Sequence, residues 1–199
     1  MPQHQNIDPE SLVPLAAFYE ALPGGFNAIH DIVARRATTD AILKQLTADL
    51  PPNENVVFED RTIPGPDGAP EVDVRIYRPV AATDSAPGLL FIHGGGMVLG
   101  NLETDHLTAV MLCESIGAVV VSIDYRLAPE HPAPAAIEDC YAALSWLFKN
   151  AAELGIDPTR VGIKGESAGG GLAAALASAD NTPKCSATDR ALRWPGIVR

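Results

Sequence analysis

Apolar residues recur at helical spacing through the first fifty positions of the chain. One helix is predicted to end at Pro23, and two more are predicted over residues 27–37 and 40–50. A Pro-Pro pair then stops the pattern. We therefore expect residues 1–52 to form an N-terminal helical layer that is separate in character from the rest of the chain.

The pattern then changes to one that is typical of strands. Residues 56–63 and 71–77 flank a Pro-Gly-Pro-Asp-Gly turn, which predicts a β-hairpin. Polar and apolar residues alternate over 71–77, as expected of a half-exposed edge strand. Residues 88–93 and 118–123 are continuous apolar runs, which predict buried strands.

Helical patterns separate the later strands. We predict helices over residues 103–116 and 135–154, a short buried strand from Arg160, and an Ala-rich helix that reaches Ala177. Strands that alternate with helices favour an α/β fold with a mostly parallel sheet and helices on both of its faces. The predicted core of this fold covers residues 53–178.

Composition and charge narrow the classes of function. The chain has 199 residues, of which 47% are hydrophobic and 20% charged, as in a soluble globular protein. Its formal net charge of -11 argues against nucleic acids and anionic membrane surfaces as partners. The apolar runs are too short to predict a membrane span.

The N-terminal residues and the cysteines indicate the cellular compartment in which the protein is expected. Residues 1–8 have neither the basic nor the apolar region of a secretory signal. Cys113, Cys140 and Cys185 show no paired spacing, and the first two fall in apolar helical patterns. We expect buried free thiols and a cytoplasmic protein.

Candidate chemistry begins at Gly165-Glu166-Ser167-Ala168-Gly169, a match to the G-x-S-x-G nucleophile elbow. In this motif a serine stands at the tip of a strained turn from strand to helix, and the two glycines relieve the crowding around it. A helix N-terminus behind the serine would favour negative charge. The five-residue pattern alone also occurs without function, so its place between a strand and a helix carries the prediction.

A second glycine-rich turn, His93-Gly94-Gly95-Gly96, follows another buried strand. Open α/β sheets bind ligands at the carboxyl ends of their strands. With the N–H of Ala168, the N–H groups of this turn could form an oxyanion hole, each donor contributing about 3 kcal/mol in the transition state. The alternative is a plain tight turn.

Three stretches together resemble the hormone-sensitive-lipase-like family of bacterial esterases within the α/β-hydrolases. They are residues 93–96, residues 124–132 (Asp-Tyr-Arg-Leu-Ala-Pro-Glu-His-Pro) and residues 165–170. The resemblance runs from about residue 5 to about residue 178. It implies an α/β-hydrolase fold whose N-terminal helical cap, residues 1–52, helps to form the acyl pocket.

The resemblance also implies a function and the roles of the motif residues. It implies hydrolysis of a small-molecule carboxylic ester through an acyl-enzyme on Ser167, with no cofactor and no metal ion. The oxyanion donors would come from the loop Gly94 to Gly96 and from Ala168. His93 would shape this loop, and Asp124 would belong to a segment that braces the site together with Arg126 and Glu130.

The chain departs from the family pattern after Ser167. A serine hydrolase of this fold needs an acid and then a histidine later in the chain. Asp180 and Asp189 follow Ser167 but lie in no recognisable context. The histidines all precede it: His4, His30, His93, His106 and His131. His106 and His131 are the fall-back candidates for the general base.

The last residues do not continue the strand and helix pattern. Residues 179–199 form an atypical tail, and no apolar strand occurs where the family has its next one. We expect a C-terminally truncated or frame-shifted chain that lacks the last strands, with the Ser167 strand as an exposed edge.

Two other classes of function follow from the same residues. The first is a truncated, catalytically defective hydrolase-fold protein. The second is a nucleotide-binding unit, which is disfavoured because residues 162–171 fit neither G-x-G-x-x-G nor G-x-x-x-x-G-K-[ST]. Whether the chain forms a homo-oligomer stays open.

Overall fold

The computed structural model describes residues 7–25, 28–82 and 85–178. The chain divides into two compact units, residues 1–48 and 49–199, and each is described by itself. The division lies close to the boundary expected at residue 52. No helix in the described ranges is long and apolar enough to cross a membrane.

The first unit contains helices α1 (Pro9–Ala21) and α2 (Ile32–Thr47). The Asp8 carboxylate begins α1 by accepting the N–H groups of Glu10 and Ser11 at 3.0 and 3.2 Å. In the same way, Asp31 begins α2 by accepting the N–H of Ala34 at 2.7 Å. The first predicted helix is confirmed.

Helix α2 is continuous, so the prediction of two helices over 27–37 and 40–50 is wrong. No glycine or proline interrupts the chain at the expected break. The Thr38 and Thr39 hydroxyls donate to the carbonyls of Ala34 and Arg35, one turn earlier, at 2.8 and 2.9 Å. The polar residues at this point are therefore accommodated within the helix.

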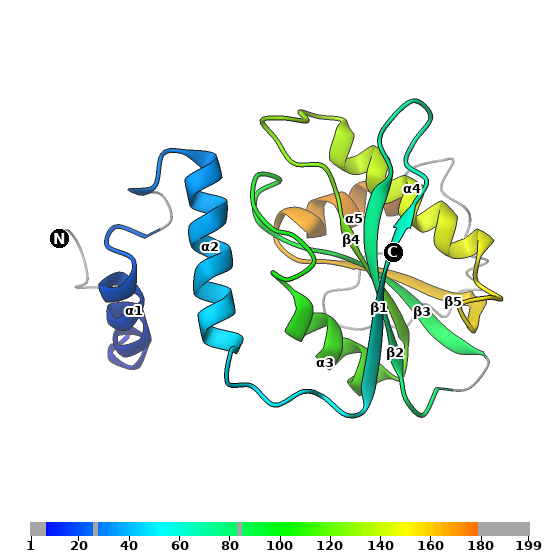
Figure 1. Cartoon of the computed structure of the whole chain (residues 1–199), viewed down its shortest axis with the longest axis horizontal. Helices are drawn as coiled ribbons and strands as arrows, with labels where there is room; N and C mark the ends of the chain where they lie inside the picture. The colour runs from blue at the N-terminus through cyan, green and yellow to red at the C-terminus, as the bar shows by residue number, and fades with distance from the viewer. Residues whose placement is uncertain (1–6, 26–27, 83–84, 179–199) are drawn as a thin grey trace. The chain divides into compact units, whose positions relative to one another are not determined.

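The second unit is built on a five-stranded sheet in the order β1-β2-β4-β3-β5 (Figure 1). The strands are β1 (Val56–Ile63), β2 (Val72–Pro79), β3 (Ala86–Ile92), β4 (Val119–Asp124) and β5 (Ile156–Gly165). β3 pairs in parallel with both β4 and β5, whereas β2 pairs antiparallel with β1 and β4. The predicted α/β class and the predicted hairpin are confirmed.

β2 lies inside the sheet, between β1 and β4, so the prediction of a half-exposed edge is wrong. Tyr77 is fully buried, and it packs in a cluster with residues of β3, β4 and α3. Arg75 is only 7% exposed. Alternate residues of β2 therefore point to the two opposite faces of the sheet, and a core covers each face.

Helices cover both faces of the sheet. Helix α3 (His106–Ile116) packs on one face, and α4 (Ala135–Lys149) and α5 (Ala168–Ser178) pack on the other (Figure 1). α4 ends at Lys149, earlier than predicted, because the chain turns there and Ile156 N–H donates back to the Ala151 carbonyl at 2.8 Å. On α4, Tyr141 is 38% exposed.

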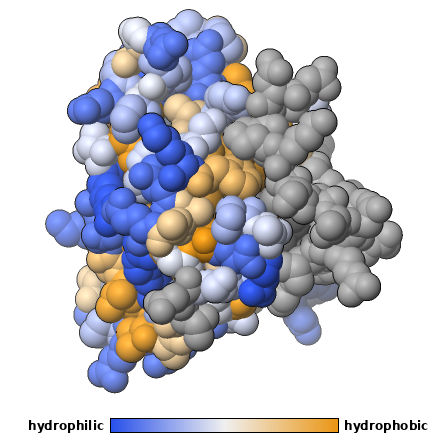
Figure 2. Space-filling model, turned by 90° about the vertical axis from the view of Figure 1, so that its right-hand side faces the viewer, coloured by the Kyte–Doolittle hydropathy of each residue, from blue (hydrophilic) through white to orange (hydrophobic). Residues whose placement is uncertain are grey.

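On the face drawn in Figure 2, hydrophilic side chains surround smaller apolar areas. Cys113 and Cys140 are buried free thiols, as predicted. Cys185, Asp180, Asp189 and the predicted atypical tail of residues 179–199 lie outside the described residues, and so does His4.

Candidate active site

Ser167 stands at a sharp turn between β5 and α5. Its φ angle is 49°, in the left-handed region that residues with a side chain rarely adopt. A Cβ on Gly165 would overlap the Gly169 carbonyl oxygen, and one on Gly169 would overlap the carbonyl oxygens of Ile92 and His93. The backbone is therefore crowded on both sides of the serine, and only glycine fits at either position.

The glycine-rich loop after β3 lies against this turn. A Cβ on Gly94 would be 3.1 Å from the Glu166 carbonyl oxygen and 3.5 Å from the Ser167 Cβ. Gly95 and Gly96 then have φ angles of 108° and 66°, which glycine adopts without strain. The structure thus brings the two predicted motifs together at the carboxyl ends of β3 and β5.

The backbone N–H groups around Ser167 differ in what they bind. Gly94 N–H donates to the Asp105 carboxylate at 3.3 Å. Among the described residues, the N–H groups of Gly95, Gly96 and Ala168 have no acceptor. Ala168 is the first residue of α5, a position whose N–H lies outside the helical ladder. Three of the four predicted oxyanion donors are therefore available to a ligand.

His93 is fully buried behind the loop. Its Nδ1 lies 2.7 Å from the Gly94 carbonyl oxygen, which can only accept, so Nδ1 carries the proton and Nε2 does not. Nε2 has no partner among the described residues. Burial lowers the pKa of His93. The ring stacks on Tyr125 at 4.2 Å between centroids, and the Tyr125 hydroxyl donates to the His93 carbonyl at 3.0 Å.

Charged side chains surround the loop. Lys164 Nζ donates to Glu166 at 2.6 Å and lies 4.7 Å from the centre of the Phe91 ring. Burial, with a smaller contribution from Glu166, raises the pKa of Asp105. The chain therefore places two carboxylates and one ammonium group beside the motifs.

The segment after β4 is held to both the loop and α4. Ala128 N–H donates to the Met97 carbonyl at 2.9 Å, which joins this segment to the glycine-rich loop. The Arg126 guanidinium bonds Asp139 of α4 at 2.7 to 3.0 Å, and the Arg126 N–H donates to the same carboxylate. Asp124, at the end of β4, is partly exposed. Ala128 and Arg126 therefore hold this segment to its neighbours, whereas the bracing role of Asp124 stays a prediction.

Among the described residues, neither His106 nor His131, the two candidates for the general base, makes a hydrogen bond with Ser167. His106 Nδ1 lies 3.0 Å from the Tyr77 hydroxyl and 3.4 Å from Arg75, so it faces the hairpin. His131 is exposed. In the described part of the chain, Ser167 Oγ makes no hydrogen bond, to either histidine or to any other residue.

Three polar residues that hold the motifs had no role predicted from the sequence: Asp105, Tyr125 and Asp139. Tyr125 follows a buried strand directly, and that position was a usable signal. The sequence around Asp105 and Asp139 contains no such signal, because the packing of α3 and α4 determines which residues these carboxylates bind.

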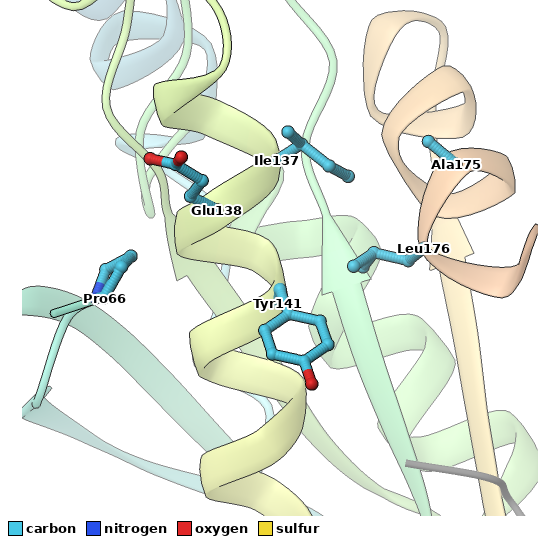
Figure 3. A pocket seen from close by; sticks show the side chains of 6 residues that line it. All are labelled: Pro66, Ile137, Glu138, Tyr141, Ala175 and Leu176. Atoms are coloured by element: carbon cyan, nitrogen blue, oxygen red, sulfur yellow. The ribbon is translucent and has the colours of Figure 1, made fainter. Parts of the chain in front are cut away.

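A cavity of about 320 Å³ lies between α4, α5 and the turn that joins β1 to β2. Figure 3 shows the residues that line it: Pro66, Ile137, Glu138, Tyr141, Ala175 and Leu176. Ala175 and Leu176 are near the end of α5, whereas Ser167 precedes its beginning. The cavity is therefore separate from the candidate active site. Within the described ranges, no three His, Cys, Asp or Glu side chains gather closely enough to bind a metal ion.

Comparison with known proteins agrees with the geometry. Residues 89–196, just over half of the chain, match the family described as "alpha/beta hydrolase fold". This match includes residues 179–196, which are most of the tail that was predicted to be atypical. Carboxylesterase NlhH of Mycobacterium tuberculosis is 41% identical over 172 residues, 86% of this chain and 51% of the relative. The arylesterase of Saccharolobus solfataricus is 35% identical over 187 residues, 91% of this chain and 58% of the relative.

Solved structures give the same result. A bacterial heroin esterase superposes with a TM-score of 0.77 at 38% identity, over 86% of this chain and 52% of that one. A hyperthermophilic esterase from the archaeon Pyrobaculum calidifontis gives 0.73 at 38% identity, over 84% and 52%. The chain spans about half the length of carboxylesterase NlhH, the first relative named above.

Proposed function

Because this chain belongs to the alpha/beta hydrolase fold family, we propose that it is a serine hydrolase that cleaves small-molecule carboxylic esters. The relatives support this substrate class, since they are named carboxylesterase, arylesterase and heroin esterase. We further propose a cytoplasmic location, because buried free thiols are typical of a reducing compartment.

In the proposed reaction, Ser167 Oγ attacks the acyl carbonyl carbon and loses its proton to a base. The N–H groups of Gly95, Gly96 and Ala168 bind the oxyanion, each lowering the barrier by about 3 kcal/mol. As the tetrahedral intermediate collapses, the base gives this proton to the alcohol oxygen, the alcohol departs, and the acyl group stays on Ser167. Water then gives a proton to the same base and attacks the acyl carbon, the proton returns to Ser167 Oγ, and the carboxylic acid departs.

One observation carries the proposal: Ser167 has a φ of 49° and lies against Gly94. Strained non-glycine residues cluster at active sites, where the fold holds a reacting group in place. The contact between the Ser167 Cβ and Gly94 supports the proposal, because the Gly95 and Gly96 N–H groups that follow Gly94 have no acceptor among the described residues. An ordinary turn from strand to helix requires neither feature.

The test is hydrolysis of nitrophenyl acetate by the purified chain and by Ser167→Ala. We expect the variant to fall to the uncatalysed background. Ser178→Ala is the matched control, because Ser178 ends the same helix and its hydroxyl donates only locally, to the Ala174 carbonyl at 2.8 Å. Equal rates in the wild type and Ser167→Ala would overturn the proposal.

A second candidate is a hydrolase-fold chain that does not itself turn over esters. It is favoured by one observation, that no histidine in the described ranges makes a hydrogen bond with Ser167 Oγ. A fluorophosphonate probe separates the two candidates. Labelling of Ser167 supports the first, and an unlabelled wild type supports the second.

A further inference from the structure

We propose that Asp105 positions the glycine-rich loop: its ionised carboxylate holds the Gly94 N–H and thereby directs the Gly95 and Gly96 N–H groups at the space beside Ser167. The catalytic meaning of this contact rests on the proposed function. The contact itself can be tested without it.

The first reason is that Asp105 occupies a capping position without capping its helix. Aspartate is favoured before a helix because its carboxylate accepts an N–H of the first turn. Asp8 and Asp31 do this for α1 and α2. Asp105 precedes α3 but makes no such bond. Its Oδ2 accepts the Gly94 N–H instead, at 3.3 Å.

The second reason is that Gly94 is the point where the two motifs meet. Its amide hydrogen is held by Asp105, and its carbonyl oxygen accepts from His93 Nδ1 at 2.7 Å and lies 3.4 Å from the Tyr125 hydroxyl, which donates mainly to the His93 carbonyl at 3.0 Å. A Cβ at Gly94 would lie 3.5 Å from the Ser167 Cβ. Because both sides of this residue are bonded, the direction of the loop that follows is set here.

The third reason is the charge around Asp105. The negative charge of Glu166 opposes the ionisation of Asp105, whereas the Gly94 N–H and Lys164 favour it. Tyr125 is also near, since Asp105 contributes to the raised pKa of its hydroxyl. Burial is the largest influence and raises the pKa of Asp105 above the ordinary value of about 3.9. Mild acid should therefore protonate Asp105 and weaken its hold on the loop.

The experiment follows the Gly94 amide signal of the ¹⁵N-labelled full chain by NMR from pH 7.5 to pH 4. We expect a titration with a midpoint above about 3.9 in the wild type. It should be absent in Asp105→Asn, which keeps the size of the side chain. Glu103→Gln is the matched control: Glu103 is two residues away, but its carboxylate pairs with Arg75 at 2.8 Å, so the titration should persist.

Activity gives a second measurement. If the wild type hydrolyses nitrophenyl acetate, Asp105→Asn should lower kcat several-fold with little change in KM, since the donors act in the transition state. An inactive wild type would count against the proposed function. The Gly94 titration would still test whether the Asp105 carboxylate holds the Gly94 N–H. A Gly94 signal that does not titrate, that titrates unchanged in Asp105→Asn, or that loses its titration only in Glu166→Gln would overturn the inference.

Discussion

Gly94 and Ser167 lie against each other, with 3.5 Å between the Ser167 Cβ and the place where a Gly94 Cβ would be. The two residues come from distant parts of the sequence. They meet because β3 and β5 are parallel neighbours, with Ile92 opposite Gly165 in the register. The parallel sheet therefore brings the proposed nucleophile and the proposed oxyanion donors to one edge.

The crowding around Ser167 predicts the effect of adding one methyl group. In Gly169→Ala, the new Cβ would overlap the carbonyl oxygens of Ile92 and His93, so β3 and α5 must separate. We expect a loss of about 1 to 3 kcal/mol in the free energy of unfolding, measured by urea denaturation.

Gly171→Ala is the matched control for this prediction. It lies in the same helix, and a Cβ there meets nothing within 4 Å. Alanine should leave the free energy of unfolding unchanged or raise it by up to about 1 kcal/mol. If both variants have the same stability, the close packing of Gly169 against β3 is wrong.

The buried Asp139 should be essential to the segment after β4. Its side chain is fully buried and bonds both the guanidinium and the N–H of Arg126. In Asp139→Ala the guanidinium loses its counterion, and we expect a cost of about 3 kcal/mol in the free energy of unfolding. Glu138→Gln is the control, since Glu138 is 50% exposed and 3.7 Å from Arg126, and it should cost less than about 0.5 kcal/mol. Equal losses in the two variants would refute this.

Stability should fall as the pH falls from 7.5 to 6. Burial lowers the pKa of His93 in the folded chain, whereas an unfolded histidine titrates near about 6.5. Below that value the unfolded chain binds a proton that the folded chain excludes, so protonation favours unfolding. The contribution of His93 over this range is at most about 0.8 kcal/mol.

His106 should add to this effect, because burial and Arg75 lower its pKa as well. His106→Gln should therefore flatten part of the pH dependence in urea denaturation at pH 7.5 and pH 6. A wild type whose stability is constant or rises toward pH 6 would contradict the neutral, buried state of His93.

The sequence predicted the parts of this structure whose physical causes are local. Gly165 and Gly169 were predicted to relieve crowding, and the same close approach of the backbone excludes a Cβ at both positions. The hairpin was found because a strong turn signal separates two strand patterns. The roles of the motif residues in catalysis remain predictions.

The features that sequence analysis missed depend on tertiary packing. The alternation of β2 predicted an edge strand, yet Tyr77 packs with residues of β3, β4 and α3. The helix predicted over residues 103–116 would include Asp105, but α3 begins after Asp105, whose carboxylate accepts a hydrogen bond from the Gly94 N–H. In α2 the threonine hydroxyls bond inside the helix, so polar residues did not mark a break.

The most direct test of the account is the acyl-enzyme on Ser167. The purified chain is mixed with nitrophenyl acetate and the reaction is quenched in acid. The protein is then digested, and the masses of its peptides are measured by mass spectrometry. We expect one acetyl group on the peptide that contains Ser167, and none on that peptide in Ser167→Ala. Release of nitrophenol at an undiminished rate by Ser167→Ala, or a wild type whose Ser167 peptide is never acetylated, would contradict the account.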